Sequence, residues 1–233
     1  MTGHFTFAHL YGIVNYIVHN QKRSRQKKAM GRTSDARERL IEAARNVIFA
    51  HSYEGVSVDE LCATAGVNKS SFYHFFSSKQ DLVLVAIESQ WQWFEQTILA
   101  PTFSDRTPPQ ERMLRFFDQV LEKQQVQKQT SGHMRGCPAG NLTLEMSTQD
   151  ELIRARVERF FQEWLRYFEQ MLCEAKEQGI VPGTLDTTTT AQALLAYFEG
   201  VMLLAKGRND PSLISTLRTG VLSLMQYQGE RIR

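Results

Sequence analysis

The most distinctive stretch of this chain for chemistry is GCPAGNL, residues 136–142, which places Cys137 between two glycines. The glycines and the proline predict a tight bend, after which Asn141 or Thr143 can begin a short helix over 142–146. Cys137 would then lie near backbone amides at a helix N-terminus, which favour a thiolate. We therefore expect Cys137 to react with electrophiles or oxidants. The competing interpretation is a structural corner that lines a cavity, with Cys137 as a small buried side chain.

Lys206 is a candidate partner of this thiol. A lysine at the end of an apolar helix can reach back toward a cavity and lower the pKa of Cys137. It can equally complement the negative end of its own helix, so both interpretations stay open.

Aromatic side chains at helical spacing can line a pocket for a hydrophobic ligand, although such residues equally form an ordinary core. The set is Trp91, Trp93, Phe94, Phe116, Phe117, Trp164, Tyr167, Phe168, Tyr197 and Phe198. The candidate ligand or redox-sensing residues are Cys137, Asn141, Lys206, Phe117, Trp164 and Phe168.

The sequence gives little support to an enzyme. It contains no HExxH, P-loop or GxSxG motif, and no carboxylate pair at a spacing that suggests acid–base work. The six histidines are scattered, and the three cysteines are widely spaced without a CxxC pair. We expect no catalytic residue, no metal and no cofactor, and a reducing cytoplasm as the location.

Residues 57–76, SVDELCATAGVNKSSFYHFF, predict two short helices around one glycine. Ser57 is the expected N-cap of the first, paired with Glu60 as a capping box, and Asn68 is the expected N-cap of the second. Gly66 suits a turn that needs positive φ. The apolar face of the first helix has i, i+3, i+4, i+7 spacing and comprises Val58, Leu61, Cys62 and Ala65. Two helices joined by so short a turn cross steeply, as in a helix-turn-helix.

The second of these helices can bury its phenylalanines and leave outward a face that donates hydrogen bonds and has no acid. That face comprises Lys69, Ser70, Ser71, Tyr73 and His74. A helix in the major groove of double-stranded DNA needs such donors for phosphates and base edges. Lys79 begins the next helix, where a cation is unfavourable unless an external anion such as a phosphate is expected. The alternative is an ordinary α-hairpin of a helical protein.

The run from Leu40 to Glu88 resembles the N-terminal domain of the TetR/AcrR family of bacterial transcriptional regulators. The AGV turn, the SSFYHFF helix and the FxSKxDL junction occur together in order. The resemblance implies an all-helical homodimer in which Lys69, Ser70, Ser71, Tyr73 and His74 face DNA. It further implies that Tyr73, His74 and Lys79 hold phosphates and that Ser57 contacts the DNA backbone. We add Asn68, which precedes the recognition helix, to the candidate DNA-binding residues. A similar GC-x-x-GN sequence recurs in a subgroup of such regulators, some of which respond to electrophiles or oxidants.

The expected fold class is all-α, with a helix-turn-helix domain over 34–80 and a helical effector-binding and dimerisation domain over 81–233. Residues 1–33 are expected to be an extension: its first 29 residues are either an upstream piece of the reading frame or a basic arm along DNA. Residues 1–34 hold six basic residues and no acid, which leaves the rest of the chain mildly acidic.

Helical patterns are expected over 34–49, with Ser34 as N-cap, and over 79–99, 111–129, 151–178, 187–206 and 210–226. The last two are too apolar to cover one another. A four-helix bundle with the same pair from a second subunit would bury the remainder, and packing within one subunit is the alternative. No apolar run approaches the roughly 18 residues of a membrane span.

The leading hypothesis is a transcriptional repressor released from a palindromic operator by a small hydrophobic or electrophilic effector. A dimeric DNA-binding protein without an effector, or an enzyme built on the C-terminal helices, are the alternatives. If Cys137 is the sensor, Cys137→Ser is expected to abolish release of DNA by quinones, aldehydes or hypochlorite while DNA binding stays intact.

Overall fold

The computed structural model describes residues 32–48, 52–104 and 107–229, and within these ranges every regular element is a helix. The elements are α2 (Arg32–Val47), α3 (Val58–Ala65), α4 (Lys69–Phe75), α5 (Lys79–Phe94), the π-helical segment η2 (Glu95–Leu99), α6 (Ala100–Thr102), α7 (Pro109–Ser131), α8 (Pro138–Met146), α9 (Glu151–Glu177), α10 (Thr187–Arg208), α11 (Ser212–Leu217) and α12 (Gly220–Leu224). The extension expected over 1–33, with its basic arm, lies outside these ranges apart from its last two residues, which begin α2.

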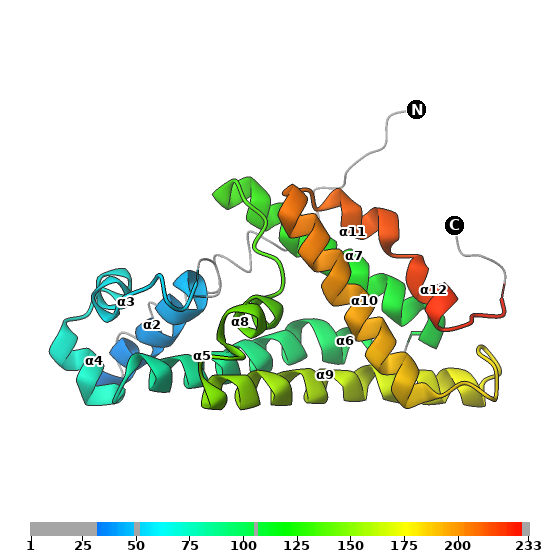
Figure 1. Cartoon of the computed structure of the whole chain (residues 1–233), viewed down its shortest axis with the longest axis horizontal. Helices are drawn as coiled ribbons and strands as arrows, with labels where there is room; N and C mark the ends of the chain where they lie inside the picture. The colour runs from blue at the N-terminus through cyan, green and yellow to red at the C-terminus, as the bar shows by residue number, and fades with distance from the viewer. Residues whose placement is uncertain (1–31, 49–51, 105–106, 230–233) are drawn as a thin grey trace.

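Helices α2, α3 and α4 form a small head at one end of the molecule (Figure 1). Gly66 ends α3 in the left-handed conformation, with φ 61° and ψ 41°, as the turn required. Arg39 of α2 donates from Nη1 to the carbonyl oxygens of Ala65 and Gly66, at 2.8 and 3.1 Å, and thereby satisfies the end of α3. The leucine and phenylalanine side chains Leu40, Leu61 and Phe72 are fully buried between the three helices.

The predicted start of the first helix, with Ser34 as its N-cap, was wrong. Helix α2 begins at Arg32, so Ser34 lies inside the helix instead of capping it. Serine is only mildly unfavourable within a helix, and its type alone therefore does not decide where a helix starts.

The body is built from α7, α9 and α10, and the long helix α5 runs from the head into the body, where it lies beside α9 (Figure 1). Its core is aromatic: Phe116, Phe117, Trp164, Phe168 and Phe198 are buried and meet mostly edge to face. Arg112 of α7 is buried and joins α7 to α9 through an ion pair with Glu174 at 2.6 Å.

The expected helix over 210–226 is two short helices, α11 and α12. The side chain of Tyr197, from α10, enters the break: its hydroxyl donates to the carbonyl oxygen of Leu217 at 2.7 Å. A Cβ on Gly220 would collide with the Tyr197 ring, so the small residue permits this packing. Of the helices in the described ranges, none has the length and apolar character that crossing a membrane requires.

Candidate DNA-binding head and effector cavity

The recognition helix α4 presents its predicted polar residues together. Lys69, Ser70, Tyr73 and His74 are exposed and Ser71 is half-buried, whereas Phe72 faces the core. Asn68 caps the helix as predicted, since its Oδ1 accepts from the Ser71 amide and the Ser70 hydroxyl, both at 2.7 Å. Ser57 caps α3 as predicted by accepting from the Glu60 amide at 3.1 Å. The two caps satisfy backbone amides at the N-termini of α3 and α4.

Lys69 is engaged by an acidic residue of α3. Its ammonium lies 2.9 Å from Asp59, and the hydrogen bond with Asp59 raises the pKa of Lys69. Both side chains are exposed, so the pair is weak in water. A DNA phosphate at Lys69 would compete with Asp59.

Lys79 has internal partners that explain a cation at the start of α5. Its ammonium donates to the carbonyl oxygens of Tyr53 and Val56, at 3.0 and 3.1 Å, and lies 4.1 Å from the centre of the Tyr53 ring. Two of its donors thus tie α5 to the turn before α3, and no external anion is needed to account for its position. Its contact with a phosphate remains a prediction.

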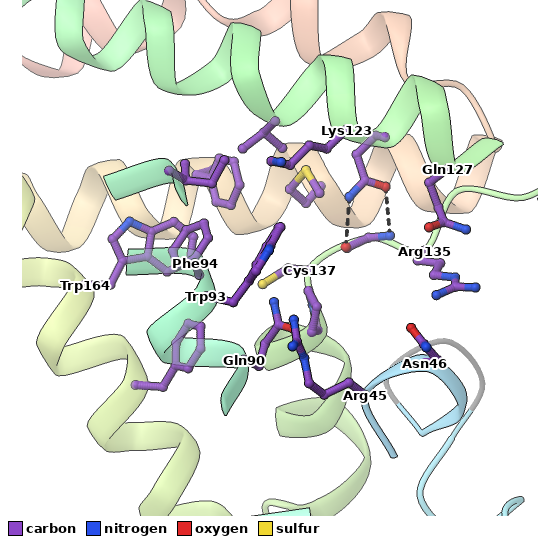
Figure 2. A pocket seen from close by; sticks show the side chains of 18 residues that line it. Arg45, Asn46, Gln90, Trp93, Phe94, Lys123, Gln127, Arg135, Cys137 and Trp164 are labelled. Atoms are coloured by element: carbon purple, nitrogen blue, oxygen red, sulfur yellow. Dashed lines mark hydrogen bonds between the residues drawn. The ribbon is translucent and has the colours of Figure 1, made fainter. Parts of the chain in front are cut away.

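Side chains from α7 and α10 form hydrogen bonds with the GCPAGNL bend. Gln124 of α7 donates from Nε2 to the carbonyl oxygen of Gly136 at 3.1 Å and accepts from the Gly136 amide at 3.3 Å (Figure 2). Asn141 donates to the carbonyl oxygen of Arg135 at 2.8 Å and accepts from Lys206 at 2.7 Å. Helix α8 begins at Pro138, four residues before the expected start, with Cys137 as its N-cap.

The predicted direction of the Cys137 pKa was wrong. The Gly140 amide donates to the sulfur at 3.5 Å, as expected of an N-cap, and lowers the pKa. Burial raises it more, and the neighbouring Glu199 carboxylate raises it further, so the pKa lies well above its ordinary value. Cys137 is therefore held as a thiol. Lys206 does not offset this effect, because its ammonium is directed to Asn141.

Nothing in the sequence indicated that Glu199 of α10 lies beside Cys137. Burial raises the pKa of Glu199 to about 7, and the hydrogen bond from the Cys137 thiol opposes that shift. Its Oε1 is buried without a hydrogen-bond partner among the described residues. A Cβ on Gly140 would collide with the carboxylate, so this glycine lets thiol and carboxyl meet.

A cavity of about 300 Å³ lies between the head and the body, with Cys137 on its wall (Figure 2). Its apolar residues are Trp93, Phe94, Ile98, Val120, Cys137, Pro138, Phe160, Trp164, Phe198 and Met202. Its polar residues are Arg45, Asn46, Gln90, Lys123, Gln124, Gln127 and Arg135, together with Gly136. A second cavity of about 290 Å³ is also lined by Cys137, together with Asn141, Glu199 and Lys206 among others.

The predicted ligand contacts are only partly brought together. Trp164 and Cys137 line the first cavity, and Asn141 and Lys206 line the second. Phe117 and Phe168 line neither and are fully buried core residues, because helical spacing does not distinguish a core face from a cavity wall. The prediction missed Phe160 and the three basic residues of the wall.

Helix α8 connects these cavities to the head. Cys137 caps its first turn, and Glu145 lies near its last turn. The Glu145 carboxylate accepts from the backbone amides of Tyr53 and Glu54, at 2.8 and 2.9 Å, in the turn that leads into α3.

Comparison with known proteins gave two family matches. The model of bacterial regulatory proteins of the tetR family matches residues 40–86, and that of the tetracyclin repressor-like C-terminal domain matches residues 109–221. The transcriptional regulator AcuR of Cereibacter sphaeroides is 32% identical over 73% of this chain and 76% of its own. The HTH-type transcriptional repressor DhaR of Mycobacterium sp. (strain GP1) is 28% identical over 87% of this chain and 98% of its own.

Two further matches add to these. The HTH-type transcriptional repressor NemR of Escherichia coli K12 is 26% identical over 74% of this chain and 84% of its own. The crystal structure of regulatory protein TetR from Rhodobacter sphaeroides has a TM-score of 0.74 and 28% identity, over 83% of this chain and 99% of that one. These matches confirm the predicted all-helical fold and a regulator instead of an enzyme. The chain belongs to the tetR family of bacterial regulatory proteins and is a DNA-binding transcriptional regulator.

Proposed function

We propose that the protein is a homodimeric repressor that leaves a palindromic operator when a small effector occupies the cavity beside Cys137. One observation carries this proposal: the cavity wall includes Arg45 and Asn46 of the head as well as Trp164 and Phe198 of the body. A ligand that fills it changes the contacts between the two parts, and so favours one orientation of the head over another. Similarity to DhaR and NemR, both described as repressors, supports the sign of regulation.

Helix α8 is the proposed route from the cavity to DNA. Movement of its first turn, at Cys137, shifts Glu145, which holds the amides of Tyr53 and Glu54. That turn leads into Ser57 and α3, and α3 packs on the recognition helix. A packed helix transmits such a shift as a rigid body.

An apolar stripe on α10 supports dimerisation. Leu203 and Leu204 are 55% and 51% exposed although both are large and apolar. They continue a face of exposed or half-exposed small residues, Ala196, Gly200 and Gly207, on which a second helix can approach closely. The same stripe on a second subunit would cover it by two-fold symmetry. Such a dimer presents two α4 helices to successive major grooves.

For an electrophilic effector, Glu199 supplies the base that a protonated Cys137 requires. The carboxylate removes the thiol proton, and the sulfur forms a bond to the β-carbon of an activated alkene or quinone as its C=C bond opens. The carboxyl then returns the proton to the resulting enolate. A carboxyl with a pKa of about 7 can both accept and return a proton near neutral pH.

Gel retardation of the DNA upstream of the gene, with and without p-benzoquinone, tests the proposal. We expect wild-type protein to retard a fragment that holds an inverted repeat and to release it on treatment. Cys137→Ser should retard the DNA equally and resist release, whereas Cys62→Ser and Cys173→Ser should respond like wild type. The exposed Cys173 is the important control, because it can react without consequence.

Two results would count against the proposal. Absence of specific retardation would refute the repressor. Normal release of Cys137→Ser by the quinone would refute the covalent step and leave a non-covalent effector.

A further inference from the structure

We propose that the cavity between head and body, whose lining includes Arg45, Lys123 and Arg135, binds a small organic anion with a flat apolar part, and that Arg135 holds its negative group. The inference rests on the proposed function only in taking this cavity as the effector site. It adds a charge requirement that the sequence did not suggest.

Three basic side chains from separate elements line the cavity. Arg45 comes from α2 of the head, Lys123 from α7, and Arg135 from the loop before α8 (Figure 2). The lining residues include no aspartate and no glutamate. Positive charges that line one cavity without a carboxylate repel one another, and a bound anion would relieve that repulsion.

Arg45 and Lys123 both lie beside the Trp93 ring. Arg45 donates from Nε to Gln90 Oε1 at 3.1 Å, and its guanidinium lies 5.8 Å from the Trp93 ring centre. The Lys123 ammonium lies 4.8 Å from the same ring. Trp93 thus contacts one cation of the head and one of the body.

Arg135 and Lys123 carry charges that no acidic side chain among the described residues offsets through an ion pair. Partial burial lowers the pKa of Arg135, because removal from water disfavours the charged form. A carboxylate or sulfonate placed against its planar guanidinium would replace the lost water with charge-assisted hydrogen bonds.

The apolar residues of the cavity lining favour a ligand that also has an apolar, ring-containing part. Phe94 and Trp164 lie on the side of the cavity away from Arg135 (Figure 2), and Phe160, Phe198 and Met202 add further apolar lining. A volume of about 300 Å³ accommodates a molecule of one or two rings. The acceptable ligand is therefore amphipathic, with its anion toward the basic residues and its rings toward the aromatic wall.

Isothermal titration calorimetry of the full chain with 2-naphthoate and with the uncharged 2-naphthamide tests the inference. We expect naphthoate to bind at least about tenfold more tightly than naphthamide. Arg135→Gln should weaken naphthoate binding by about tenfold and leave naphthamide binding unchanged, and Arg135→Lys should restore most of the difference. Arg166→Gln removes the same charge from an exposed residue of α9 outside the cavity lining and should bind both probes like wild type.

The inference is overturned if naphthoate does not bind, if naphthamide binds equally well, or if Arg135→Gln weakens both probes alike. The retardation assay separates this failure from failure of the proposed function. Release of DNA by uncharged benzoquinone without any binding of naphthoate would refute the anion site and leave the repressor intact. Charge-dependent binding of naphthoate by a protein that retards no operator would do the reverse.

Discussion

Removal of Glu145 should loosen the turn that joins the head to α8. The carboxylate accepts from the backbone amides of Tyr53 and Glu54, at 2.8 and 2.9 Å, across more than ninety residues of sequence. Glu145→Ala leaves both amides without this acceptor, whereas Glu145→Gln keeps one oxygen and can satisfy one of them.

The size of the effect follows from the two hydrogen bonds. A hydrogen bond to a charged group contributes about 1.5 to 3 kcal/mol. The partly buried bond of Tyr53 lies near the lower limit, and the exposed bond of Glu54 lies below it. Since a factor of ten corresponds to about 1.4 kcal/mol, amide hydrogen exchange at Tyr53 should accelerate about tenfold in Glu145→Ala. Glu54, whose bond is exposed, should accelerate less, and Glu145→Gln should give an intermediate result.

Hydrogen exchange followed by NMR resolves the two amides individually. Glu177→Ala, which removes an exposed carboxylate near the end of α9, is the matched control and should leave both rates unchanged. Equal exchange at Tyr53 in wild type and Glu145→Ala would show that the carboxylate does not hold the turn. The proposed route through α8 would then lose its connection to the head.

Two further predictions concern single residues. Because burial raises the pKa of Glu199 from 4.5 to about 7, the folded chain holds a proton that the unfolded chain releases between these values. The free energy of unfolding should therefore fall by about 3 kcal/mol as pH rises across this range, and Glu199→Gln should remove that slope in urea titrations. Lys79→Ala should lower both operator affinity and the melting temperature, because its ammonium holds the Tyr53 and Val56 carbonyls. Tyr73→Ala, at an exposed position, should lower affinity alone; equal melting temperatures for the two variants would contradict this assignment.

The local sequence pattern was enough to predict the helix-turn-helix of the head, α3 and α4. The turn depends on Gly66, the caps on Ser57 and Asn68, and the exposed face on residues within a single helix, so neighbours in sequence are also neighbours in space. Most helices of the body followed from spacing for the same reason. The split between α11 and α12 did not, because the side chain that enters it, Tyr197, comes from another helix.

The sequence alone therefore determined the fold class and the helix-turn-helix, and it predicted Cys137 as a candidate sensor, since each of these inferences depends on short stretches of chain. Only the tertiary structure decided the chemistry around them. The protonation of Cys137 depends on burial and on Glu199 of α10, which outweigh the helix N-terminus to which the cysteine belongs. The charge of the cavity depends on Arg45, Lys123 and Arg135, which line one cavity only when α2, α7 and the loop before α8 pack together. Desolvation and charge density are properties of the packed molecule, and no spacing along the chain encodes them directly.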